Sequence, residues 1–103
     1  MYLSDPKEVE EVLGFFYEHL GKELEISFCV FDGLTETEPM LVTEVKAAEP
    51  TLVTLQASQS QRKLHINPHH YSFATVSPDR KRLEIGRLLG SSVTLRLTAS
   101  EIG

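Results

Sequence analysis

Three histidines lie close together around a proline turn, and imidazole nitrogens are ligands for zinc and other borderline metals. His65, His69 and His70 are therefore candidate metal ligands. Adjacent side chains in extended chain point apart, so at most two of the three converge, and no neighbouring acid or cysteine completes a ligand set. A polar turn explains the same residues, and we favour that interpretation. A metal or small-ligand site here is one of three hypotheses, and no cofactor is predicted.

Basic residues gather in the second half of the chain, where they could neutralise a phosphate backbone while a nearby ring stacks on a base. The candidate nucleic-acid-binding residues are Lys63, Tyr71, Arg80, Lys81, Arg82 and Arg87, with Arg62 at the margin of the group. Three consecutive bases after a turn are usually a solvated corner, and a net charge of −5 repels nucleic acid at long range. Binding of RNA or another nucleic acid is therefore an alternative hypothesis.

Nothing in the chain has the spacing of a catalytic motif. The sequence contains no nucleophile elbow, no phosphate-binding glycine loop and no zinc-protease histidine pair. Cys29 could be a nucleophile only beside a base, and a cysteine in mid-strand usually acts as a small hydrophobic residue. We expect a protein that is not an enzyme, and no catalytic residue is predicted.

The composition is that of a globular chain in a reducing compartment. The 103 residues are 41% hydrophobic and include one cysteine, which cannot form an internal disulfide. The first turns are acidic, unlike a signal or transit peptide, and no apolar run approaches the ~20 residues of a membrane span. We expect a cytoplasmic protein with no membrane contact.

Charge is divided unevenly along the chain. Residues 1–50 hold twelve acids and three bases, whereas residues 51–103 hold three acids and seven bases. The two halves could attract each other within one chain or between copies. With exposed sheet edges, this favours a non-catalytic interaction module that binds a protein partner or forms a homo-oligomer. Phe15 and Phe31, outside the main apolar stripe, are its candidate interface residues.

One amphipathic helix is expected from about Pro6 to Leu20. Asp5 suits the N-cap and Pro6 the first helical position, and Gly21 suits the residue just past the C-terminus. The apolar stripe at helical spacing consists of Val9, Val12, Leu13, Phe16 and Leu20.

Period-two alternation predicts strands after Gly21. The expected strands are Leu24–Val30, Met40–Lys46, Thr51–Ala57, Leu64–Ile66, Tyr71–Val76 and Val93–Thr98. The turns are Asp32–Gly33 and Ser77–Asp79, Leu34–Pro39 is expected to be an exposed loop, and Ser100–Gly103 is expected to fray. Residues Arg80–Leu89 fit neither period.

These elements predict a single α+β domain over residues 1–103. Five to six short antiparallel strands must bury one helix, which favours a strongly curved sheet or a small open β-barrel. The sequence leaves open the choice between the two, because bulges decide the curvature.

Two partial family resemblances accompany this fold. The helix and strands from Gly14 to Arg80, ending in the segment from His69 to Pro78, resemble the bacterial Sm-like RNA chaperone family. That resemblance implies a five-strand barrel that binds RNA in rings. Residues Ser77 to Leu97 are similar to the C-terminal domain of Gre-type transcription factors. The two imply different folds, and we count neither as membership.

Overall fold

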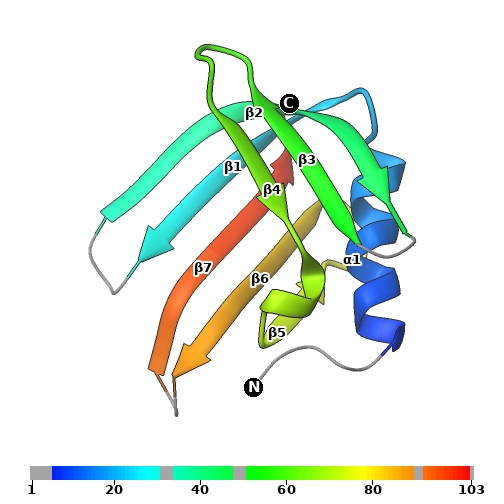
Figure 1. Ribbon diagram of the computed structural model, residues 1–103, viewed down its shortest axis with the longest axis vertical. Coiled ribbons are helices and arrows are strands. Elements are labelled where there is room, and N and C mark those ends of the chain that lie inside the picture. The colour runs from blue at the N-terminus through cyan, green and yellow to red at the C-terminus, as the bar shows by residue number, and fades with distance from the viewer. Residues whose placement is uncertain (1–5, 31–33, 48–50, 90–91, 103) are drawn as a thin grey trace.

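Seven strands form a single antiparallel sheet that curls around one helix in the computed structural model, which describes residues 6–30, 34–47, 51–89 and 92–102 (Figure 1). In chain order the elements are α1 (Pro6–Glu18), β1 (Glu23–Val30), β2 (Leu34–Lys46), β3 (Leu52–Ala57), β4 (Lys63–Ile66), η1 (Pro68–His70), β5 (Phe73–Val76), β6 (Arg82–Leu89) and β7 (Ser92–Glu101). The described helices include none that is long and apolar enough to cross a membrane.

The sheet joins two local meanders. Its order is β4-β3-β2-β1-β7-β6-β5, so every neighbouring pair is also consecutive in the chain except β1 and β7. β4 and β5 are the two end strands, and the described sheet is therefore a half-barrel rather than a closed barrel. The predicted α+β fold with a strongly curved antiparallel sheet is confirmed, with one strand more than the upper prediction.

Two stretches that were not expected to be strands are strands in the structure, and one of them, β6, is the additional strand. The predicted exposed loop Leu34–Pro39 is wrong, because it forms the first half of β2 and pairs with β1 from Val30 back to Glu25. The ambiguous segment Arg80–Leu89 supplies β6, which pairs with both β5 and β7. Pairing with strands on both sides outweighs a weak local pattern.

The C-terminal end is also more ordered than expected. The prediction that Ser100–Gly103 frays is wrong for Ser100 and Glu101, which pair with β1 and belong to β7. The side chain of Glu101 adds a second attachment, because its Oε2 lies 2.9 Å from Nε2 of the buried His19. Asp5, Phe31, the Asp32–Gly33 turn and Gly103 lie outside the described residues.

The helix is buried more broadly than its predicted stripe. Phe15 is completely buried, so the prediction that it lies outside the main core as an interface residue is wrong. Its ring packs edge-on against Phe16, with the centroids 5.5 Å apart. The helix contacts β2 as well as β5 and η1, so the curled sheet surrounds it and buries a wider arc than a flat sheet would. Leu20 lies beyond the end of the helix at Glu18 and is 44% exposed.

Two glycines provide opposite tests of this packing. A Cβ at Gly86 in β6 would overlap the ring of Phe73 and lie 2.8 Å from the carbonyl oxygen of Leu95. A Cβ at Gly14 in α1 would make an ordinary contact, 3.5 Å from Arg80 Nη2. We expect Gly86→Ala to lower the free energy of unfolding by about 1–3 kcal/mol. Gly14→Ala should raise it by ~0.5–1 kcal/mol, because alanine favours helix.

Urea unfolding of both variants beside the unaltered protein measures the two changes. A Gly86→Ala variant as stable as the unaltered protein would contradict the packing of Phe73 on β6.

Candidate binding site

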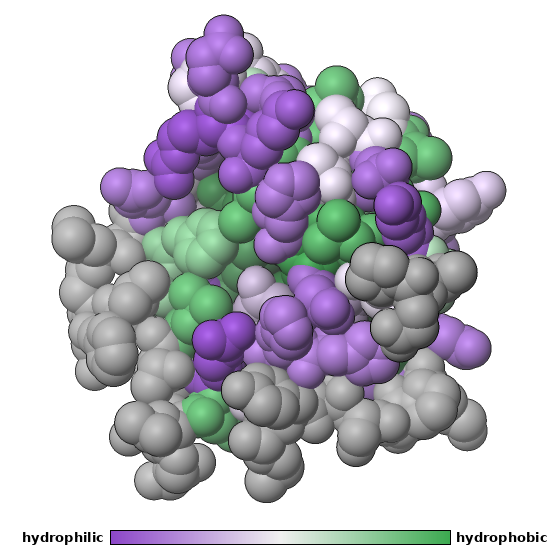
Figure 2. Space-filling model, viewed as in Figure 1, coloured by the Kyte–Doolittle hydropathy of each residue, from purple (hydrophilic) through white to green (hydrophobic). Residues whose placement is uncertain are grey.

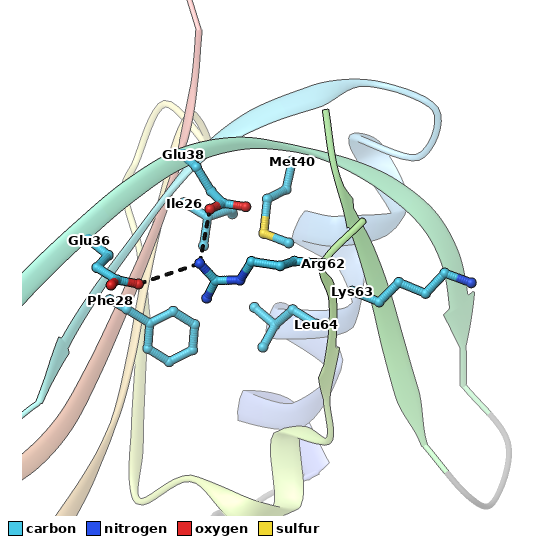
Figure 3. Close-up of a pocket in the computed structure, with 8 residues that line it drawn as sticks. All are labelled: Ile26, Phe28, Glu36, Glu38, Met40, Arg62, Lys63 and Leu64. Atoms are coloured by element: carbon cyan, nitrogen blue, oxygen red, sulfur yellow. Dashed lines mark hydrogen bonds and ion pairs between the residues drawn. The ribbon is translucent and has the colours of Figure 1, made fainter. Parts of the chain in front are cut away.

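Two glutamates of β2 lie on the same face of the sheet as the hydrophobic core. In the β1–β2 register Ile26 is opposite Glu38 and Phe28 is opposite Glu36, and opposed residues share a face. Ile26 is only 2% exposed, so this face is the concave, core-forming one. The carboxylates therefore project into the end of the half-barrel that we call the mouth, defined by Ile26, Phe28, Glu36, Glu38, Met40, Arg62, Lys63 and Leu64 (Figure 3).

The mouth contains a small cavity over an apolar floor. Its volume is about 50 Å³, and Ile26, Phe28, Met40 and Leu64 supply its hydrophobic lining. On the face that contains the mouth, apolar surface shows between hydrophilic side chains (Figure 2). Sites for drug-sized ligands are roughly 300–1,000 Å³, so the cavity is the size of one functional group rather than of a large ligand.

Arg62 reaches across the mouth from the segment just before β4. Its Nη1 lies 3.3 Å from Oε2 of Glu38 and 3.5 Å from Oε2 of Glu36. A single nitrogen thus serves both carboxylates, and the side chain of Arg62 is 62% exposed. Exposed pairs without bidentate geometry contribute about 0–1 kcal/mol, so this contact closes the mouth only weakly.

The mouth is one positive charge short. Lys63 borders the cavity, but its ammonium group points away from the two carboxylates (Figure 3). One guanidinium therefore faces two carboxylates. Oε1 of Glu38 is buried and accepts no hydrogen bond from any described residue. A buried carboxylate oxygen left in this state costs ~1–3 kcal/mol, so the site favours an added donor of positive charge.

Neither Glu36 nor Glu38 was a candidate from the sequence, because both fall in the stretch expected to be an exposed loop. The sequence nevertheless contains a local pattern that indicates their position. Glu36, Glu38, Met40 and Val42 alternate in phase, so extending the period-two pattern of the predicted strand Met40–Lys46 backwards places both acids on its buried face. The acidic and threonine-rich composition hid that alternation.

The three candidate histidines lie on the surface. His65 is exposed on β4, with Nδ1 3.3 Å from Oγ1 of Thr54, while His69 and His70 are exposed in η1. Throughout the described ranges, no group of three or more His, Cys, Asp or Glu side chains could hold a metal ion. The fourth histidine, His19, is buried and makes two hydrogen bonds.

The candidate nucleic-acid residues come from several elements of the fold, and some of their side chains have partners within the chain. Tyr71 is 6% exposed, and its ring lies under the guanidinium of Arg87, whose central carbon is 5.8 Å from the ring centroid, so the ring is not free to stack on a base. Arg80 is paired with Glu18 at 2.8 Å. Lys63 is on end strand β4, whereas Arg82 is on β6, which four strands of the described sheet separate from β4.

The corner before β6 has its own internal contacts. Asp79 accepts hydrogen bonds from the Ser77 hydroxyl and the Lys81 backbone N–H, and these bonds lower the pKa of its carboxyl. Arg80 has a φ of 59°, in the left-handed region that tight turns require. These contacts are those of a solvated turn, and the exposed side chains of Lys81 and Arg82 extend from it.

The two oppositely charged halves of the sequence meet within the chain. The ion pairs of Glu18 with Arg80 and of Glu36 and Glu38 with Arg62 join acids of the first half to bases of the second. Acidic side chains of the first half therefore contact basic side chains of the second half within one folded chain.

Comparison with known proteins identifies no relative, because no family model, curated protein or solved structure matches the chain. The five-strand barrel implied by the Sm-like resemblance differs from the seven-strand half-barrel observed, in which residues 69–78 contribute to η1 and β5. The segment similar to Gre-type factors covers β6 and part of β7, whose partner β1 lies outside that similarity.

The placement of Tyr71 is testable by titration. Burial raises the pKa of the Tyr71 phenol above its ordinary value of 10.0, and the guanidinium of Arg87 partly opposes this shift. The folded state retains a proton that the unfolded chain releases, so this contribution to stability is present below pH 10.0 and is lost as the pH rises further.

The difference in tyrosinate absorbance between the unaltered protein and Tyr71→Phe isolates this phenol. We expect its midpoint to lie above the ordinary value in the folded protein and to fall to that value in denaturant. A folded-state midpoint at or below the ordinary value would contradict the buried position.

Proposed function

We propose that this protein is a non-catalytic binding module and that its mouth holds a cationic group of the partner, an ammonium or guanidinium. The observation that carries the proposal is the buried Oε1 of Glu38, which has no hydrogen-bond partner among the described residues. It lies beside a second carboxylate, that of Glu36, over an apolar floor. A charged N–H donor placed there would satisfy that oxygen and balance the charge of the pair.

The physical chemistry of the mouth favours an alkyl cation over other small groups. Charge-assisted hydrogen bonds to carboxylates are roughly twice as strong as neutral ones. The side chain of Glu38 is 29% exposed, so water screens its charge less than that of Glu36, which is 69% exposed. Phe28, Met40 and Leu64 offer apolar contacts to methylene groups that follow the charged head. An anionic head of the same size would be repelled by the two carboxylates.

Butylammonium is a probe of this chemistry. Titration into the isotopically labelled protein, followed by NMR, should shift the amide signals of residues 26–28, 36–38, 40 and 62–64, while butyrate should not. Glu38→Gln should weaken butylammonium binding at least ~10-fold, because it removes one of the two charges that hold the cation. Glu44→Gln, on an exposed position of the same strand beyond its bulge, is the matched control and should bind as the unaltered protein does.

Equal binding of butylammonium by the Glu38→Gln and Glu44→Gln variants would contradict the proposal. So would shifts confined to residues outside the mouth.

Self-association is a second candidate, favoured by the open ends of the sheet. Within the described sheet, β4 and β5 are each paired on one side only, and an unpaired strand edge can add a strand from another copy. We expect light scattering to give a molar mass of at least a dimer at high protein concentration. A monomer mass across a wide concentration range, at low and at moderate salt, would contradict this candidate.

A further inference from the structure

The structure points to a partner that presents its cation from an extended segment. We infer that the mouth takes a lysine or arginine side chain carried by a strand of another protein laid along the free edge of β4. This inference rests on the proposed cation site and adds the form of the partner. Its first support is that β4 pairs with β3 from Gln56↔Lys63 to Val53↔Ile66 and has no second strand partner among the described elements.

The free edge of β4 and the cation site are next to each other. Leu64 of β4 is part of the floor of the mouth. Arg62 is the residue immediately before β4, and its side chain reaches both carboxylates. The sheet curls so that β3 and β4 lie across the concave space from β7 and β6 (Figure 1). An added strand on β4 would therefore border the same space into which Glu36 and Glu38 project.

Strand geometry then decides which side chains of the partner enter. Side chains alternate between the two faces of a sheet, and neighbouring strands are about 4.8 Å apart. Every second side chain of the added strand would therefore lie on the concave face beside Leu64. A lysine or arginine at such a position has a long apolar stem and a charged end, which match the apolar floor and the carboxylates of the mouth. Backbone hydrogen bonds to β4 would hold the segment, and the cation would select its sequence.

Within the chain, Arg62 makes the contact with the carboxylates that we assign to the partner's cation. It offers the carboxylates the same chemistry, but through one nitrogen and from a largely exposed position. It leaves Oε1 of Glu38 without a donor among the described side chains. A partner cation that enters the mouth therefore competes with a weak contact. Replacing Arg62 by glutamine should strengthen binding of the partner segment several-fold, because it removes both a competitor and a repelling charge.

The test uses a capped seven-residue peptide with threonine at odd positions, valine at positions two and six, and lysine at its centre. The 103-residue chain is titrated at concentrations where its molar mass is that of a monomer, so that a second copy does not occupy the edge. We expect the peptide to bind at least ~10-fold more tightly than butylammonium, because two linked contacts add to one another. Amide shifts should include Lys63–Ile66 as well as the mouth.

Three peptide variants separate the parts of the inference. Norleucine in place of lysine should lower the affinity at least ~10-fold, since the charge is lost while the strand remains. Methylation of alternate backbone nitrogens gives two further peptides, one for each set. Only one set faces β4 in a paired strand, so one methylated peptide should fall to the affinity of butylammonium and the other should bind like the parent.

Distinct results would overturn the two levels of the proposal. If butylammonium binds in the mouth but the lysine peptide binds no more tightly, or if both methylated peptides bind equally, the strand inference is wrong and the cation site stands. If neither probe shifts the mouth, both are wrong. Tighter binding of the norleucine peptide than of the lysine peptide would likewise exclude a cationic partner.

Discussion

The pairing of β1 with β7 is the constraint on which the rest of the structure depends. The other neighbouring strands are consecutive in the chain, so local hairpins can form them, but β1 and β7 bring together residues about seventy positions apart. This pairing puts Ile26 opposite Ala99 and Phe28 opposite Leu97, and so unites the two meanders in one concave apolar face. Loop closure over that distance has an entropic cost, which the burial of the shared core must offset.

The helix stabilises that face from within, and His19 secures its end. Nδ1 of His19 lies 2.7 Å from the carbonyl oxygen of Phe15, and Nε2 lies 2.9 Å from Oε2 of Glu101. Both partners accept hydrogen bonds, so the ring satisfies both when it donates from both nitrogens. The last turn of the helix is thereby joined to the last residue of β7, the strand that also completes the pairing with β1.

The mouth exists because the helix is shorter than the sheet it covers. Thirteen helical residues are about 20 Å long, whereas the thirteen residues of the curved β2 measure about 43 Å along the strand. One end of the concave face therefore extends beyond α1, and there Phe28, Glu36 and Glu38 line an open cavity. At this end the helix does not cover the inner face of the half-barrel, so polar side chains can stand there without being buried in the core.

The local pattern of the sequence was sufficient to predict the helix, most strands and an α+β fold with a curved sheet. This is because the spacing of apolar residues indicates which face of an element is buried. The same pattern was insufficient for β6, where the register shifts between Arg87 and Leu88, and for the first half of β2. None of the predicted site residues supplies a carboxylate to the mouth, although Lys63 and the marginal candidate Arg62 line it. Glu36 and Glu38 face inward in phase with Met40 and Val42, and the local β1–β2 hairpin fixes that phase. Phe15 is buried because the sheet curls around the helix. That curl unites two meanders through the hydrogen bonds between β1 and β7, which no local window of sequence contains.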